Sequence, residues 1–133
     1  MYIYAYGYIY MREGNDFMER LTNFFKLLSD ETRLRILILL FHKRLCVCEL
    51  CGIMEEAQPK ISKHLAKLRD LGLVKDDRQE QFIFYSLNLN NQLYKNILQN
   101  IVENIAEYSL SERDLQRSID AEKYLEKCTP QPS

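Results

Sequence analysis

Residues 47–71 contain two runs of apolar residues at helical spacing, separated by a few mostly polar residues. The spacing predicts a short helix over 47–55 and a longer one that ends near Leu71. Pro59 opens the longer helix, because its φ is already set for the first turn and its missing N–H is not needed there. Gly72 follows and supplies the left-handed residue that commonly ends a helix.

Two β-rich runs come directly after these helices. The first covers residues 73–77 and the second covers 82–87, which begins Phe-Ile-Phe-Tyr. The polar residues 78–81 between them predict a projecting turn. Two helices joined by a short turn and followed by a β-hairpin form a winged helix-turn-helix. The predicted fold class is therefore mainly α with a small β-hairpin.

The other segments supply a core and a surface for a partner. Apolar residues almost surround the helix predicted over 32–41, so we expect this helix to be buried on most sides. A helix over 17–28 has one apolar face, with Asp16 as its N-cap. A long helix over 91–109 has two apolar stripes, which favours packing against a second copy of the chain. The predicted dimer stripe consists of Leu93, Ile97, Ile101 and Ile105.

At 133 residues the chain is expected to hold one main domain, over residues 17–109. Residues 1–16 form a tyrosine-rich arm that we expect to be poorly ordered, unless translation starts later, at Met11 or Met18. Residues 110–133 are expected to form a C-terminal helix and a tail. We find no run near the ~20 apolar residues that a membrane span needs. The first residues also lack the features of a secretory signal, so a cytoplasmic protein with reduced thiols is expected.

The helix that starts near Pro59 has the charge pattern of a DNA-reading helix. At about 100° per residue, Ile61, Leu65 and Leu68 share one face and lysines occupy the opposite one. The formal net charge of the chain is −1, so any DNA binding has to come from such local charge. The alternatives are a solvated lysine face and, for the histidine in this helix, an ordinary surface role. The predicted DNA-binding residues are Gln58, Lys60, Ser62, Lys63, His64, Lys67, Arg69 and, at the hairpin tip, Arg78.

Three of the four cysteines, Cys46, Cys48 and Cys51, fall within six positions. Cys48 and Cys51 are three residues apart and therefore share a helix face. On a regular helix Cys46 would lie about 200° from Cys48, so the three sulfurs converge only if residue 46 is in non-helical backbone. Ligand binding is therefore expected to couple to the start of this helix. The fourth cysteine, Cys128, stands alone near the C-terminal end and is expected to be a bystander.

Three thiolates without a neighbouring histidine suit a soft ion. A structural zinc site normally takes four ligands, and His42 is the nearest candidate for the fourth. A trigonal-pyramidal As(III) or Sb(III) needs only three sulfurs, and no organic cofactor is expected. The alternative is that the three cysteines are small buried hydrophobes.

These motifs resemble the ArsR/SmtB family of metalloid-responsive winged-helix repressors, and most closely its arsenical-resistance branch. The similarity covers roughly residues 17–108, with LCVCELC at 45–51, QPKISKHL at 58–65 and LRDLGL at 68–73. The resemblance implies a dimer that holds double-stranded operator DNA until As(III) or Sb(III) binds the three cysteines. It also implies that Gln58, Ser62 and His64 belong to the DNA-reading helix.

Two departures from other family branches narrow the choice of ion. Relatives that sense cadmium or lead add cysteines from the N-terminal arm, and residues 1–16 contain none. Zinc-sensing relatives use side chains of the long dimer helix, whereas His42 and His64 both lie outside 91–109. Three alternatives stay open: a thiol redox switch on the same fold, a thiol- or metal-handling protein without DNA binding, and a winged-helix module for protein contact. No enzyme is expected, because no catalytic base accompanies a nucleophile.

Overall fold

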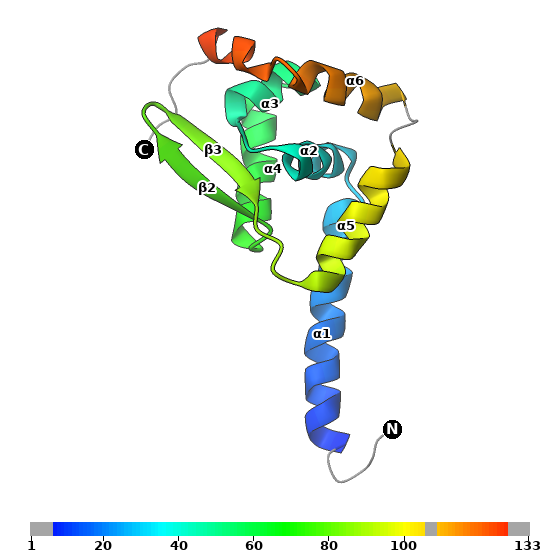
Figure 1. Cartoon of the computed structure of the whole chain (residues 1–133). Helices are drawn as coiled ribbons and strands as arrows, with labels where there is room; N and C mark the ends of the chain where they lie inside the picture. Colours follow the sequence, from blue (N-terminus) through cyan, green and yellow to red (C-terminus); the bar gives the residue numbers. More distant parts are fainter. Residues whose placement is uncertain (1–6, 106–108, 128–133) are drawn as a thin grey trace.

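The structure is a computed structural model that describes residues 7–105 and 109–127 (Figure 1). Its elements are α1 (Gly7–Leu28), α2 (Glu31–His42), β1 (Leu45–Cys46), α3 (Val47–Met54), α4 (Gln58–Asp70), β2 (Val74–Gln79), β3 (Phe82–Leu87), α5 (Gln92–Ile105), α6 (Ser109–Ser118) and the 3-10 helix η2 (Ala121–Lys127). The order α3, α4, β2, β3 confirms the predicted winged helix-turn-helix. None of these helices combines the length and the hydropathy that crossing a bilayer requires.

Helix α2 lies in the middle of the core, as its apolar sequence predicts. Ile36, Leu37 and Leu39 are almost completely buried, and α1, α4, α5, α6 and β3 all contact the helix. Asp30 caps its N-terminus, because the Asp30 carboxylate accepts a 2.9 Å hydrogen bond from the backbone N–H of Arg33. The buried α2 therefore positions the helices and the strand that surround it.

The sheet has three antiparallel strands in the order β1-β3-β2, one strand more than the predicted hairpin. The additional strand, β1, is only two residues long, and its Leu45 and Cys46 pair with Tyr85 and Phe84. Two residues carry no recognisable alternation, so the sequence pattern could not reveal this strand. Its pairing fixes the residue before α3 to the hairpin.

The hairpin turns more tightly than predicted. Strands β2 and β3 stay paired as far as Gln79 and Phe82, which leaves a two-residue turn at Glu80 and Gln81. Arg78 therefore lies within β2, opposite Ile83, and not at the tip. Glu80 adopts a φ of 59°. Such turns are usually signalled by Asn-Gly or Asp-Gly, and the sequence lacks that signal here.

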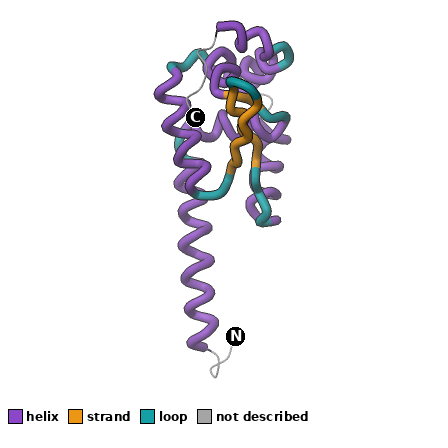
Figure 2. Tube along the Cα trace, turned by 90° about the vertical axis from the view of Figure 1, so that its left-hand side faces the viewer, coloured by secondary structure: helices purple, strands orange, loops and turns teal. Residues whose placement is uncertain are grey.

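Helix α1 begins at Gly7, well before the predicted start at Phe17. Residues 7–16, which were expected to be poorly ordered, are helical, and the expected N-cap Asp16 lies inside the helix. No proline interrupts these residues, so the helix can continue through them. Figure 2 shows the first part of α1 extending away from the rest of the chain. Residues 1–6 lie outside the described part.

The C-terminal segment is helical but broken. The sequence predicts one C-terminal helix and a tail over residues 110–133, whereas α6 ends at Ser118 and the 3-10 helix η2 follows. The Ser118 hydroxyl donates a 2.7 Å hydrogen bond to the Leu115 carbonyl, a local bond of the kind that competes with helix continuation. Helix α6 lies across α2 and α3, and η2 lies on α3 (Figure 1).

Candidate nucleic-acid interface and thiol cluster

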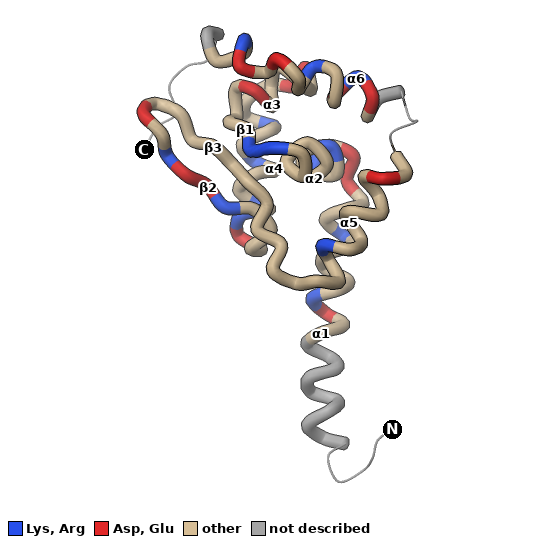
Figure 3. The backbone as a smooth tube through the Cα atoms, viewed as in Figure 1, with Lys and Arg blue, Asp and Glu red and all other residues tan. Residues whose placement is uncertain are grey.

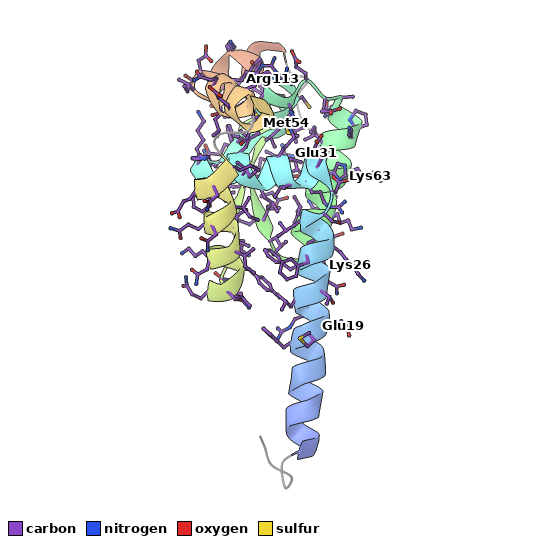
Figure 4. The ribbon with its side chains drawn as sticks, turned by 90° about the vertical axis from the view of Figure 1, so that its right-hand side faces the viewer. Glu19, Lys26, Glu31, Met54, Lys63 and Arg113 are labelled. Carbon is purple, nitrogen blue, oxygen red and sulfur yellow. The ribbon has the colours of Figure 1, made fainter. Side chains whose placement is uncertain are left out.

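Helix α4 presents the basic face that its sequence predicts. Its N-cap is Ala57 in extended conformation, with Pro59 in the first turn. The buried side chains are Ile61, Leu65 and Leu68, which confirms the predicted inner face. On the other side, the side chains of Lys60, Lys63 and Lys67 are exposed, and Gln58 and Ser62 are half-buried. Figure 4 shows Lys63 projecting outward from the helix.

Acidic side chains accompany the cations at both ends of α4. Lys60 forms an ion pair with Glu56 at 3.1 Å, one helical turn earlier. Arg69, at the other end, pairs with Asp76 of β2 at 3.1 Å and lies 4.0 Å from Asp70. Exposed pairs of this kind contribute little to stability. The pairs do fix the positions of Lys60 and Arg69 before any phosphate approaches. The most accessible positive charge of this face therefore lies in the middle of the helix.

His64 lies at the junction of α4 with the start of α2. Its Nδ1 is 3.4 Å from an Arg33 guanidinium nitrogen, and its Nε2 is 3.9 Å from the Asp30 carboxylate. Burial lowers the pKa of His64, while Asp30 acts in the opposite direction and more weakly. The imidazole is therefore neutral at pH 7. A direct contact of His64 with DNA stays a prediction, and its position between two helices gives it a structural role as well.

We expect the protein to lose stability as the pH falls below 7. The unfolded chain protonates His64 near its ordinary pKa of 6.5, whereas the lowered pKa of the folded state resists protonation, so acid favours unfolding. At lower pH, Asp30 acts in the same direction, because its hydrogen bond from the Arg33 N–H lowers the Asp30 pKa below 3.8. Urea midpoints at about pH 7.5 and about pH 5 should differ less in His64→Gln than in the wild type. An equal loss in both proteins would contradict this assignment.

The wing carries mixed charge. Strand β2 holds Lys75, Asp76, Asp77 and Arg78, whereas β3 has no Lys, Arg, Asp or Glu, as the tan strand in Figure 3 shows. Asp77 lies 3.5 Å from the Arg44 guanidinium, which also stacks 4.4 Å above the Phe84 ring centre. Arg78 remains a predicted DNA contact, from a position within the strand.

Cys46 is the N-cap of α3 and lies in extended backbone, with φ −93° and ψ 170°. Its N–H donates a 3.0 Å hydrogen bond to Glu49 Oε1, and its sulfur faces the Glu49 N–H in return, which completes a capping box. The geometric condition for convergence, a non-helical residue 46, is thus met. Burial raises the Cys46 pKa to about 11, so its thiol is protonated at neutral pH.

Glu49 has a capping role that the sequence pattern alone did not predict. Glu49 is 5% exposed, an unusual burial for a carboxylate. The signal was present, because Cys46 and Glu49 have the Ser/Thr-x-x-Glu spacing of a capping box with cysteine in place of the hydroxyl residue.

Cys48 and Cys51 lie on α3 one turn apart, Cys48 with 6% of its surface exposed and Cys51 partly buried. Cys46 and Cys51 are free thiols, whereas Cys48 is disulfide-bonded. Burial raises the Cys51 pKa. Among the described residues, no three Cys, His, Asp or Glu side chains are arranged to hold a metal ion. The donor set suits a soft ion, but ligation requires a reduced Cys48 and movement of the side chains. Cys128 lies outside the described residues.

Helix α5 divides its apolar residues between the core and the outer surface. Leu98 is completely buried, and Tyr94 stacks on Phe24 of α1 with ring centres 4.2 Å apart. Of the predicted dimer stripe, Leu93 is 40% exposed, and the other three residues, Ile97, Ile101 and Ile105, are half-buried within one chain. The dimer interface stays a prediction.

Comparisons with known proteins agree with this arrangement. The family model described as "Bacterial regulatory protein, arsR family" matches residues 30–76, from the cap of α2 into β2. The "Arsenical resistance operon repressor" of Escherichia coli (strain K12) is 51% identical over 65 residues, which cover 48% of this chain and 56% of that protein. The "Transcriptional repressor SmtB homolog" of Synechocystis is 33% identical over 90 residues, which cover 66% of this chain and 68% of that protein.

The chain belongs to the ArsR family. This is a family of bacterial regulatory proteins and not of enzymes. Among solved ArsR-like structures, reduced HlyU from Vibrio cholerae has a TM-score of 0.63 and 30% identity, covering 74% of this chain and 98% of that one. The chain spans about half the length of the first curated relatives it matches, 56% for the Escherichia coli protein. The matched family segment ends before α5, so α6 and η2 lie outside it.

Proposed function

We propose that this ArsR-family protein is a transcriptional repressor that binds operator DNA as a homodimer and leaves it when As(III) or Sb(III) binds Cys46, Cys48 and Cys51. The observation that carries the proposal is the position of the three cysteines at the start of α3, the helix that packs against α4. The identity with the arsenical resistance operon repressor of Escherichia coli over 65 residues supports the choice of inducer.

The DNA-binding part of the proposal rests on α4. The first residues of a recognition helix approach base edges in the major groove, a position that fits the half-buried Gln58 and Ser62. The exposed Lys63 and Lys67 then face the phosphates, whose contacts position the protein without reading sequence. In a homodimer formed through α5, two such helices read two half-sites.

Inducer binding acts through the cap of α3. Arsenous acid reacts with three thiols so that each S–As bond replaces one As–O bond, and each thiol proton leaves in a water molecule. Because the Cys46 sulfur faces the N–H of Glu49, ligation of Cys46 removes it from its capping position. The inner face of α3, with Leu50, Ile53 and Met54, is buried in the core. A change at the start of α3 is therefore transmitted to α4 by packing.

The test is an arsenite titration of the reduced protein bound to DNA from upstream of its own gene. Fluorescence anisotropy of labelled DNA should show release at arsenite concentrations that leave the protein folded. Strictly anaerobic, reducing buffer keeps Cys48 as a free thiol that can bind the ion. It also ensures that any release of DNA is caused by arsenite and not by oxidation of the cysteines. Tight DNA binding that neither arsenite nor antimonite changes would contradict the proposed inducer. Absence of DNA binding would contradict both the proposed repressor function and the proposed inducer.

Lys63→Ala should weaken DNA binding similarly on every sequence and make it less dependent on salt. Each phosphate contact contributes about one to the slope of log K against log salt, so a dimer that loses two contacts should lose about two. The matched control is Lys95→Ala, which removes an exposed lysine from α5 and not from α4. Identical salt slopes for the two variants would contradict the placement of α4 on DNA.

A thiol redox switch is the second candidate, and the disulfide at Cys48 is the observation that favours it. In that case oxidation of the cysteines, and not ligation, changes α3 and releases the DNA. Release by arsenite under strictly reducing conditions supports the metalloid proposal. Release by oxidants alone supports the redox candidate.

A further inference from the structure

The C-terminal residues 109–127, here called the strap, lie across α2 and α3 (Figure 1). They comprise α6 and η2 and fall outside the segment that the family model matches. Neither the DNA-binding face nor the predicted dimer stripe uses them. Their contacts show what the strap covers.

Two arginines fasten the strap. Arg35 of α2 makes two 2.8 Å hydrogen bonds to the two carboxylate oxygens of Asp114, and the side chains are 11% and 3% exposed. Arg117 of the strap donates a 2.9 Å hydrogen bond to the Ile53 carbonyl and pairs with Glu55 at 3.1 Å. Ile53 is in the last turn of α3, whose carbonyls lack partners within the helix. The strap therefore caps the end of α3 as well as crossing it.

The strap covers the thiol face of α3. Positions 48, 51, 52 and 55 share this face, since they are three or four residues apart, and it lies opposite the buried Leu50 and Ile53. The Tyr124 ring occupies the place that a Cβ on residue 52 would take, so only glycine permits the contact. Arg117 holds residue 55 at the other end of the same face. Gly52 is next to Cys51 and one turn after Cys48.

We propose that the strap is a lid over the thiol face, and that a soft trivalent ion reaches Cys48 and Cys51 only when Tyr124 leaves Gly52. This inference rests on the proposed function for the identity of the ligand. Binding of the ion to Cys48 and Cys51 competes with packing of the strap on α3. The strap therefore raises the inducer concentration that is needed to release the DNA. By linkage, a bound ion loosens the strap to the same extent.

The strap has the features of a segment that opens locally. Its second half is a 3-10 helix, which has poorer hydrogen-bond geometry than an α-helix. Ile119, between the two pieces, is 71% exposed. The Ser111 hydroxyl is buried without a hydrogen-bond partner among the described residues, which costs stability. The buried residues among the described part of the strap are small or polar, namely Ser111, Asp114, Ser118 and Ala121, and a segment that buries few large apolar side chains opens at lower free energy than the core.

The test compares Tyr124→Ala with Tyr124→Phe and Glu122→Gln. The first removes the ring from Gly52, the second keeps it, and the third changes an exposed residue of the strap. The protein is reduced, the reductant is removed anaerobically, and iodoacetamide labelling of Cys48 and Cys51 is followed by peptide mass mapping. Labelling that follows the open fraction should be at least about tenfold faster in Tyr124→Ala and unchanged in the other two.

Arsenite association, measured on the same variants, should show the same order. Faster labelling in Tyr124→Ala without arsenite binding by any variant would support the lid and overturn the proposed inducer. Equal labelling in folded Tyr124→Ala and wild type would overturn the lid. If Tyr124→Ala does not fold, as judged by circular dichroism, Arg117→Ala tests the same opening from the other end of α3, and equal labelling there would overturn it too.

Discussion

Cys48→Ser is expected to stay on its operator DNA at arsenite concentrations that release the wild type. The serine hydroxyl is a hard, neutral donor and does not replace a thiolate on a soft ion. Thiolate-rich structural zinc sites gain roughly 10–16 kcal/mol from their ligands. On that scale, loss of one ligand in three moves the arsenite midpoint by at least about 100-fold. The measurement is anisotropy of labelled DNA during an arsenite titration in reducing buffer.

The control for Cys48→Ser is Glu122→Gln, which changes an exposed residue of the strap and leaves every thiol in place. DNA affinity without arsenite should be unchanged in Cys48→Ser, because Cys48 lies on the face of α3 opposite the buried Leu50 and Ile53. Equal release in wild type and Cys48→Ser would remove the thiol cluster from the mechanism. Loss of response in both variants would mean that the effect is not specific to the thiol.

Local sequence patterns were sufficient to predict the helices that surround the candidate site. Pro59, the apolar positions of α4 and Gly72 each act within one helix, so sequence spacing carries their information, and the structure places all of them as predicted. The same holds for the burial of α2. These features depend on neighbours a few residues away.

The features that sequence spacing could not reveal depend on contacts between distant segments. Strand β1 exists because Leu45 and Cys46 meet β3, about forty residues later. The pairing of Arg69 with Asp76 depends on how the hairpin folds back on α4. The Arg35–Asp114 pair joins residues 79 positions apart. The cysteine cluster was recognised in the sequence, but its cover by Tyr124 follows only from the path of the strap.

Breaking the Arg35–Asp114 pair is expected to have the other large effect, a loss of unfolding free energy. Asp114→Ala leaves the guanidinium of a mostly buried arginine without its carboxylate, and removing one partner of a buried pair costs roughly 3–5 kcal/mol. Arg35 keeps a 3.4 Å contact to the Met54 carbonyl, so we place the loss of unfolding free energy at the lower end, about 3 kcal/mol. For a chain of this size the melting temperature then falls by about 10 °C.

Gln116→Ala is the matched control, since it truncates an exposed residue of α6 and should change stability by less than about 0.5 kcal/mol. The shape of the urea transition adds a second criterion for Asp114→Ala. If the strap unfolds with the domain, the midpoint falls and the slope m is unchanged. If the strap detaches first, m decreases, because part of the surface is already exposed before the main transition. A midpoint and slope equal to those of Gln116→Ala would mean that the pair does not hold the strap, and the lid over the thiol face would then depend on Tyr124 and Arg117 alone.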